Sequence, residues 1–458
     1  MSIVWDTYRI EDIAEKITIG PFGSRMKSDA YVESGVPVIR GTNLTGSKNF
    51  SGDWVFITEK LAKQLESCCV SKGDLVFPHR GAIGEVGIVD SQFPQYMMSS
   101  SLMKLRCNPS IADSEFIYYF FKSYQGRYEL LKNASQVGTP GIGQPLTSLK
   151  NIELKLPSLG EQKRIAKILS DLDDKIHLND QINQTLESIA QAIFKSWFID
   201  FEPVRAKIAA KQEGKDPELA AMCVISGKSE EELKQMAKED FAELQATVAL
   251  FPDELVESEL GEVPRGWEVS TIGKRFNVVM GQSPKGDTYN GNKHGKLFFQ
   301  GRAEFGWRYP TPRLYTTDPK RVAKENDILM SVRAPVGDMN VAMEECCIGR
   351  GLSALSHRSG SFSYSYYCLK ALQSKFNVFN GEGTVFGSIN QNDLKNISFI
   401  EPINELIDLF AKTINKYDQR IKLNSFNTKS LIDVRDTLLP QLLSGEVDVS
   451  DLQGEGVL

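Results

Sequence analysis

The stretch "LKNI" occurs twice in this chain, at Leu149–Ile152 and at Leu394–Ile397, 245 residues apart. A repeated tetrapeptide can arise by chance in a long chain, so the flanking sequence decides its meaning. Downstream, "DDKIHLN" (Asp173–Asn179) matches "DQRIKLN" (Asp418–Asn424) at the same separation. One separation that extends well beyond the tetrapeptide indicates a duplicated segment.

The match continues upstream, and the separation grows in steps. "YYFFK" (Tyr118–Lys122) meets "YYCLK" (Tyr366–Lys370) at 248, and "DLVFPHRGAIG" (Asp74–Gly84) meets "DILMSVRAPVG" (Asp327–Gly337) at 253. A steady drift is what duplication followed by a few loop insertions produces, so we predict two tandem copies of one module, each too long for a solenoid repeat. Single-residue matches extend the series: Gly138-Thr139 with Gly383-Thr384, Gly41 with Gly301, Gly20 with Gly281, and Trp5 with Trp267.

The first part of each copy has a mixed composition. Short runs rich in β-formers, such as "VPVIRG" and "IELKLP", alternate with Gly, Pro and Asn, and "EFIYYFFKSY" reads as a helix. We therefore expect an α+β fold with two mixed, β-rich domains, at residues 1–158 and 262–402.

The second part of each copy has the apolar spacing of a long helix, at residues 159–202 and 403–458. Apolar side chains recur in steps of three and four, as in a coiled-coil seam. The matched Asn179 and Asn424 interrupt both seams; a buried Asn with a partner fixes the register, whereas a solvated Asn at the seam edge does not. The predicted seams are Ile165, Ile168, Leu172, Ile176, Ile182, Leu186, Ile189, Ile193 and Trp197, and Ile407, Phe410, Ile414, Tyr417, Ile421, Leu431, Val434, Leu438 and Leu442.

Charge is distributed unevenly along the chain, whose net charge is −6. Residues 262–400 carry 18 Lys and Arg against 12 Asp and Glu, and residues 1–158 carry 17 against 16. Residues 159–261 carry 12 against 21, and their part at 203–261 reads as an acidic helical linker. Basic-to-neutral blocks that alternate with acidic ones fit either a nucleic-acid binder or ordinary solvated faces.

Composition also restricts the class of protein. We find no apolar run long enough to cross a bilayer and no secretory leader, so we expect no membrane association. The seven cysteines are an odd number without ligand spacing, which favours a reduced, cytoplasmic chain with neither disulfides nor a metal site.

Two similar but non-identical domains joined through paired helices suit either of two tasks. A rigid spacer between two readers can recognise two different DNA half-sites, and the same spacer can hold two protein-binding domains apart. Arg80 and Arg333 favour DNA, because they occupy matched positions in Gly- and Pro-rich turns of both copies. The alternative for these arginines is a structural ion pair with Asp74 and Asp327.

A basic, aromatic-rich loop in the second copy supplies further candidates. "GRAEFGWRYPTPRLYTTDPKR" (Gly301–Arg321) resembles a loop that faces a nucleic-acid groove, although plain surface loops have the same composition. The predicted DNA-binding residues are Ser24, Arg40, Thr42, Asn43, Arg80, Thr139, Gln282, Arg302, Arg308, Arg313, Arg333 and Thr384.

Catalytic motifs are missing from the sequence. "FNGEG" (Phe379–Gly383) resembles the glycine loop of methyl-donor enzymes, but no strand–loop–helix unit follows it, and we interpret it as a turn. "SGKS" (Ser226–Ser229) lacks the first glycine of a phosphate-binding loop. No Asn/Asp-Pro-Pro-aromatic motif for base methylation is present. We predict no catalytic residues and a chain that reads DNA and recruits other subunits.

Four stretches of the sequence carry a resemblance to a known family. "LKNIELKLPSLGEQKRIAKILSDLDDKI" with "SWFIDFEPVRAK", then "GEVPRGWEV", and the distal "LLPQLLSGEVDV" resemble the specificity subunits of type I restriction-modification systems. The resemblance covers essentially the whole chain. It implies two target-recognition domains and two conserved helices that form an antiparallel coiled coil.

The resemblance also implies a function. Such a subunit binds a split, asymmetric sequence in double-stranded DNA, one part per recognition domain. It docks two methyltransferase subunits that modify adenine with S-adenosylmethionine, and in the full complex two restriction motor subunits that use ATP with Mg²⁺; the chain itself holds no cofactor. The second copy has "EPINELIDLF" where the first has "PSLGEQKRIAKIL", so the Glu161-Gln162 signature occurs once and the two methyltransferase contacts need not be identical. A single-chain DNA methyltransferase and a coiled-coil scaffold that binds no DNA are the alternatives.

Overall fold

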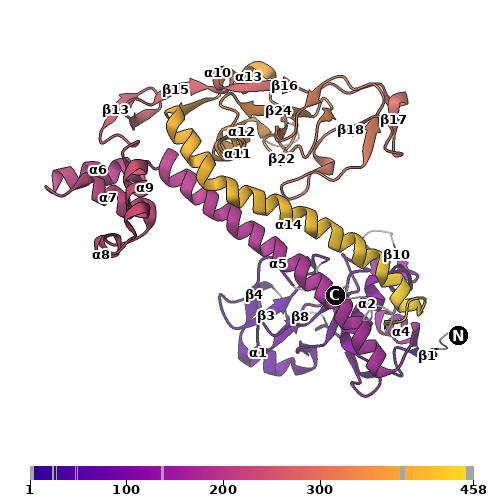
Figure 1. Cartoon of the computed structure of the whole chain (residues 1–458). Helices are drawn as coiled ribbons and strands as arrows, with labels where there is room; N and C mark the ends of the chain where they lie inside the picture. Colours follow the sequence, from indigo (N-terminus) through magenta and orange to yellow (C-terminus); the bar gives the residue numbers. More distant parts are fainter. Residues whose placement is uncertain are drawn as a thin grey trace. The chain divides into compact units, whose positions relative to one another are not determined.

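The computed structural model describes residues 5–22, 25–26, 28–46, 48, 50–135, 139–381 and 387–449 (Figure 1). The chain divides into two compact units. The first contains the residues up to Asn179 and those from Phe426 onward, and the second contains Asp180–Ser425. Helices α5 (Leu159–Phe198) and α14 (Asn404–Ser444) each contribute one part to each unit.

The first unit is built on two four-stranded sheets. The first sheet is antiparallel, and its strands lie in the order β2 (Ala14–Ile19), β9 (Leu102–Cys107), β6 (Leu75–Pro78) and β7 (Gly87–Ile88). The second has the order β4 (Val55–Ile57), β3 (Val36–Ile39), β8 (Tyr96–Met98) and β5 (Cys69–Val70), with β3 and β8 parallel.

Shorter elements complete this unit. The antiparallel pair β1 (Asp6–Arg9) and β12 (Glu153–Leu156) joins its beginning to the entry of α5. The others are α1 (Glu59–Gln64), α2 (Ser114–Lys122), α3 (Tyr124–Leu131), β10 (Ala134–Ser135), β11 (Gly141–Ile142) and α4 (Pro145–Lys150).

The second unit repeats this topology. Its antiparallel sheet has the order β16 (Phe276–Met280), β24 (Leu352–His357), β21 (Ile328–Ser331) and β22 (Met339–Val341). Its other sheet has the order β17 (Tyr289–Asn290), β19 (Leu314–Thr316), β18 (Lys296–Phe299), β23 (Cys346–Ile348) and β20 (Val322–Ala323). Strands β18 and β23 are its parallel pair, as β3 and β8 are in the first unit, and β17 is the added strand.

The remaining elements of the second recognition domain also match. Strands β15 (Glu268–Thr271) and β25 (Ser398–Glu401) form the antiparallel pair that corresponds to β1 and β12. Its helices are α10 (Ile272–Arg275), α11 (Phe362–Ala371), α12 (Gln373–Asn377) and α13 (Gln391–Asn396). The predicted α+β fold with two tandem copies is therefore confirmed.

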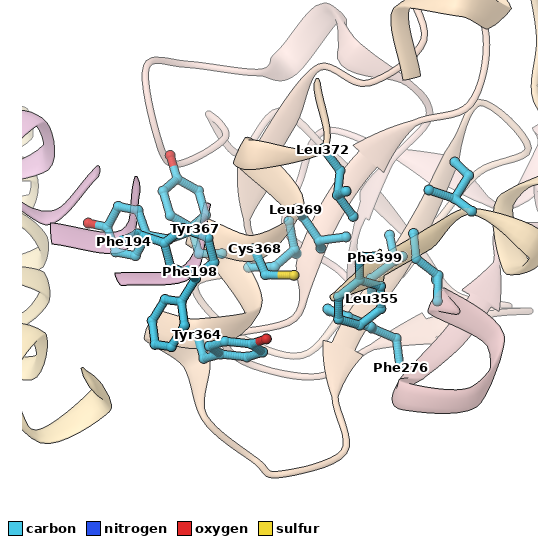
Figure 2. Packing of buried hydrophobic residues seen from close by; sticks show 14 of the residues in the cluster. Phe194, Phe198, Phe276, Leu355, Tyr364, Tyr367, Cys368, Leu369, Leu372 and Phe399 are labelled. Atoms are coloured by element: carbon cyan, nitrogen blue, oxygen red, sulfur yellow. The ribbon is translucent and has the colours of Figure 1, made fainter. Parts of the chain in front are cut away.

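The core of the second unit joins its recognition domain to the helices. Phe194 and Phe198 of α5 point toward Tyr364 and Tyr367 of α11 (Figure 2), and the Phe198 and Tyr364 rings lie 5.7 Å apart. Edge-on ring contacts of this kind add about 0.5–1.5 kcal/mol each to the gain from burial. The apolar face of "SYSYYCLK" is therefore what fixes this domain on α5.

The two long helices run antiparallel within each unit. In the first unit Asp173 contacts Arg435 at 2.8 Å and Asn179 contacts Thr428 at 3.4 Å, so residue numbers rise along α5 while they fall along α14. In the second unit Asn183 accepts a 3.0 Å hydrogen bond from Asn424, and Phe194 lies against Phe410. The antiparallel helix packing is confirmed.

The seam differs from the predicted one near its middle. Asn179 and Asn424 are buried, at 2% and 1% exposure, so they are not solvated residues at the edge. The predicted seam residues Ile189 and Val434 are 39% and 47% exposed, whereas Asn183 and Glu187 are buried. The buried stripe here follows polar side chains, because Asn183 has a partner on the facing helix and Glu187 has partners in the recognition domain. Apolar spacing alone does not reveal such a pattern.

Residues 203–261 form a small helical body that ends in a hairpin. Lys207 is 2% exposed, and its ammonium donates hydrogen bonds to Glu218 at 2.7 Å and to the carbonyls of Val248 and Phe251 at 2.9 Å. The predicted linker is thus a packed structure around one buried cation. Its elements are α6 (Glu202–Gln212), α7 (Pro217–Ser226), α8 (Glu230–Lys234), α9 (Lys238–Val248), β13 (Leu255–Ser258) and β14 (Gly261–Pro264).

The described residues contain neither a candidate membrane span nor a cluster of metal-ligating side chains. None of the helices described is both long and apolar enough to span a membrane. Nor does the described part of the chain bring three or more His, Cys, Asp or Glu side chains together as a metal site would.

Candidate DNA-recognition site

Four loops of the second unit meet where its two sheets adjoin. Backbone hydrogen bonds join them: Gly281 N to Leu352 O at 2.9 Å, Gly349 N to Phe299 O at 2.8 Å, and Val332 N to Gly351 O at 3.0 Å. The loops that these bonds tie together begin after β16, β18, β21 and β23. We call them the second loop cluster: residues 281–283, 300–302, 332–334 and 349–351.

The first unit has an equivalent set of loops with equivalent bonds. Gly20 N donates to Leu102 O at 2.8 Å, Ser99 N to Ile39 O at 2.9 Å, and His79 N to Ser101 O at 2.9 Å. We call residues 20–22, 40–42, 79–81 and 99–101 the first loop cluster. Both clusters consist of loops that follow the ends of matched strands. The duplication therefore preserved the backbone arrangement of the site.

Two glycines allow the loops of each cluster to pack closely against one another. A Cβ atom at Gly20 would lie 2.0 Å from the carbonyl oxygen of Ser99, and one at Gly281 would lie 2.1 Å from that of Gly349. Backbone atoms cannot yield to such contacts, so any side chain here would separate the loops. This explains the matched glycines that the sequence comparison found.

Arg80 and Arg333 occupy the same place in the two clusters. Each follows the end of a sheet strand, β6 or β21, and each backbone forms an isolated bridge, Arg80 with Gly141 and Arg333 with Ser388. Both side chains are exposed, and neither forms an ion pair within the described part of the chain. The partners in the two bridges, Gly141 and Ser388, are 247 positions apart, so the separation of 245 inferred from Gly138-Thr139 does not hold at these two residues.

The alternative role of these arginines as structural ion pairs is wrong. Asp74 is 1% exposed and receives two 2.7 Å hydrogen bonds from the Arg106 guanidinium. Asp327 accepts from the backbone of Lys324 at 2.8 Å. Asp74 is thus bound by other partners, and Arg80 and Arg333 remain available to a ligand.

Arg308 must be removed from the predicted DNA-binding residues. It is 1% exposed, and its guanidinium bonds to Asp418 of α14 while stacking 4.4 Å from the Tyr366 ring. Burial alone would lower the pKa of Arg308, but the Asp418 carboxylate reverses this and holds the pKa above its usual value. Arg308 is a core residue that joins its loop to the helix.

Two further arginines of this loop are exposed but paired. Arg302 forms an ion pair with Asp338, and Arg313 forms one with Glu304 at 2.8 Å. Both stay accessible to DNA, with their charge partly balanced by the acid.

The other predicted residues divide by burial. Asn43 is fully buried: its side-chain Nδ2 donates to the carbonyls of Ser51 and Asp53, and its Oδ1 accepts from the backbone N–H of Arg40. It therefore supports the loop and cannot reach DNA. Arg40 is half-buried and donates to Asp53 O at 2.6 Å. Thr42, Thr139 and Gln282 are exposed, while Ser24 and Thr384 lie outside the described residues.

One arginine of the second cluster was missed by the sequence comparison. Arg350 is exposed at the tip of the loop Gly349–Gly351, and its amide donates to Ser283 Oγ at 3.2 Å. The signal was available, because the "SSSL" and "GRGL" segments before β9 and β24 align at Leu102 and Leu352. In the first cluster, burial lowers the pKa of His79, and the charge of Arg80 adds to this effect, so the neutral form of this histidine is favoured.

Comparisons with known proteins agree with this arrangement. The family model described as the type I restriction modification DNA specificity domain matches residues 3–188 and 264–433. A type I restriction enzyme HindI specificity subunit from Haemophilus influenzae is 32% identical over 82% of this chain and 87% of its own length. A putative type I restriction enzyme MjaX specificity subunit from Methanocaldococcus jannaschii is 29% identical over 97% and 94%.

A solved structure supports the fold. The crystal structure of a type I restriction-modification system S subunit from M. genitalium aligns over 96% of both chains with a TM-score of 0.57 at 16% identity. The single-chain methyltransferase and the scaffold without DNA recognition are set aside by the family match. The chain belongs to the family of type I restriction-modification DNA specificity subunits, the non-catalytic, DNA-recognising members of these complexes.

Proposed function

We propose that this specificity subunit recognises a split, asymmetric sequence in double-stranded DNA, with one half-site bound by each loop cluster. The observation that carries the proposal is that the two clusters share one backbone arrangement but present different exposed side chains. The hydrogen bonds that join the loops are the same in both units, and Arg80 and Arg333 stand at one shared position. The neighbouring exposed residues differ, so the two clusters would prefer different bases.

The chemistry of these clusters suits a duplex. An unpaired exposed guanidinium can bind phosphate or form two hydrogen bonds to guanine in the major groove. The excess of basic residues in 262–400 attracts the DNA backbone, whereas the acidic residues 203–261 do not. The acidic helical body therefore faces away from the bound duplex in this proposal.

The partners follow from the kind of complex that the relatives are named for. We propose that the subunit positions two methyltransferase subunits that methylate adenine from S-adenosylmethionine. For restriction, two motor subunits that consume ATP with Mg²⁺ would join the same complex. We also propose that the protein acts in the cytoplasm, where its DNA ligand would be found.

The test exchanges one recognition domain. Residues 262–402 are replaced by the corresponding block of a related subunit, and methylated adenines are mapped in cells that express the complex. One half-site of the methylation motif should change while the other stays. A motif that changes in both halves, or that is one contiguous sequence, would contradict one half-site per domain. Replacement of residues 203–261 by those of the same relative is the control and should leave both half-sites unchanged.

A further inference from the structure

Apart from Arg302, whose charge is paired with Asp338, each loop cluster has a second arginine, and the two second arginines stand on opposite loops. In the first, Arg40 follows β3 and Ser100 stands before β9; in the second, Gln300 follows β18 and Arg350 stands before β24. The equivalence is structural, because Leu102 pairs with Pro78 as Leu352 pairs with Ser331. The second arginine without an ion pair in the described structure thus stands on one side of this loop contact in the first cluster and on the other side in the second.

Arg350 is held in a defined position although its side chain is free. A Cβ atom at Gly349 would lie 2.7 Å from Gln300 O, and one at Gly351 would lie 3.1 Å from the same oxygen. The two glycines therefore let the loop pack tightly against the strand end, and the residue between them is directed outward. Arg350 is exposed and forms no ion pair among the residues that the structure describes.

Arg350 and Arg333 are close enough to act on one groove. Val332 N donates to Gly351 O at 3.0 Å, so the Cα atoms of the two arginines are joined by two chain steps and one hydrogen-bonded pair. These steps place the two Cα atoms at most about 13 Å apart. The major groove is about 12 Å wide, so both guanidinium groups can enter it together.

Charge pairing distinguishes these two arginines from Arg302 of the same cluster and from Arg313, which lies farther along the same chain segment. Arg302 is paired with Asp338 and Arg313 with Glu304. Base reading requires a donor that is not already satisfied by a carboxylate, because a bidentate contact to guanine uses both free N–H groups. Arg333 and Arg350 meet this requirement.

We propose that Arg350 is a specificity-determining residue that reads a guanine in the half-site of the second recognition domain, where the first domain has Ser100 in its place. This inference rests on the proposed function of the second loop cluster. It makes the second half-site depend on a guanine contact that the first cluster cannot make from this loop.

The matched variants are Arg350→Ser, which introduces the residue of the first domain, and Arg358→Ser. Arg358 is also exposed and free of ion pairs in the described structure, but it follows the far end of β24, about 20 Å along the strand. Equal melting temperatures of the two variants and the parent chain establish that the fold is kept. The assembled complex is then used to select sites from a randomised DNA library at several salt concentrations.

With Arg350→Ser, the preference for guanine at one position of one half-site should fall by about 5- to 150-fold, and all other positions should stay unchanged. Arg358→Ser should select the parent sequence. Uniformly weaker binding with the full preference retained, and a salt slope lowered by about one, would identify a phosphate contact and overturn the proposal. An unchanged selection would overturn it as well. Should the parent complex select one contiguous site, the bipartite function fails, while the guanine preference at Arg350 is still decided by the same comparison.

Discussion

In the first unit, the Tyr119 hydroxyl donates a 2.8 Å hydrogen bond to Asp173 of α5, and in the second unit Tyr367 donates one of 3.1 Å to Asp418 of α14. The tyrosines and the aspartates are matched positions of the repeat. Each recognition domain is thus joined to the long helix that follows it by the same contact. The duplication preserved this joint in both copies.

The cation that neutralises each aspartate has a different origin. Asp173 is paired with Arg435 of α14, and this pair is partly exposed, at 28% for the arginine side chain. Asp418 is paired with Arg308 of the recognition domain, whose side chain is 0% exposed. In the first unit the ion pair holds helix to helix, whereas in the second it holds the domain itself. A repeat can therefore keep its contact surface while the charge balance is rebuilt from another part of the chain.

Removal of these two arginines should produce the largest difference in stability loss between the two units. Arg308→Met leaves Asp418 buried without its cation and Glu187 with the more distant Lys370, and we expect a loss of about 3–5 kcal/mol in the second unit. Arg435→Met, at the half-exposed pair, should cost the first unit about 1 kcal/mol or less. Hydrogen exchange followed in each unit of the full chain measures both, since a chain of two units need not unfold in one step. Equal losses in the two units would mean that the burial of the Arg308–Asp418 pair does not increase the cost of removing its cation.

Arg80 and Arg333 should be equivalent in their effects. Each is exposed and unpaired among the described residues, so Arg80→Ala and Arg333→Ala should change the free energy of unfolding by no more than about 0.5 kcal/mol. As base readers, each should cost about 1–3 kcal/mol of discrimination in its own half-site. Melting temperature and affinity for cognate and scrambled DNA, measured on the assembled complex, test this. A lower melting temperature with unchanged affinity would assign both to structure.

A buried polar pair of the second unit has an apolar counterpart in the first. His357 Nε2 lies 3.0 Å from Glu401 Oε1, and the equivalent positions are Cys107 and Leu156. Either His357→Cys or Glu401→Leu alone leaves the other polar side chain buried without its partner, which should cost about 1–3 kcal/mol of stability. The double change restores the apolar pair, so its cost should be smaller than the sum of the single costs. Denaturant unfolding of the four variants measures this coupling, and strictly additive costs would contradict it.

The sequence predicted the parts that repetition and periodicity encode. The "LKNI" match and its drift located both copies, and Arg80 with Arg333 followed from that alignment. Arg308 could not be identified as buried, because an arginine among aromatics looks alike in a surface loop and in a core, and its partner Asp418 is 110 residues away. Arg350 was missed because its counterpart is Ser100, so a search for identical residues in both copies passes over it. Differences between copies, which a repeat search discards, are where specificity would lie.

The polar seam of the helix pair predicts a further difference between the units. In the second unit Asn424 donates to Asn183 at 3.0 Å, and in the first Asn179 reaches Thr428 at 3.4 Å, a longer and weaker bond. Asn424→Leu leaves the amide oxygen of Asn183 buried without its donor, which should cost about 1–3 kcal/mol, whereas Thr428→Val should cost less than about 1 kcal/mol. Leucine at both Asn183 and Asn424 removes both polar partners and should return the stability to that of the parent or above it. Hydrogen exchange of α5 on either side of Asn179 measures the two effects separately. If the double leucine variant stays as unstable as the single one, the asparagine pair contributes through its own hydrogen bond, and relief of an unpaired group does not explain its presence.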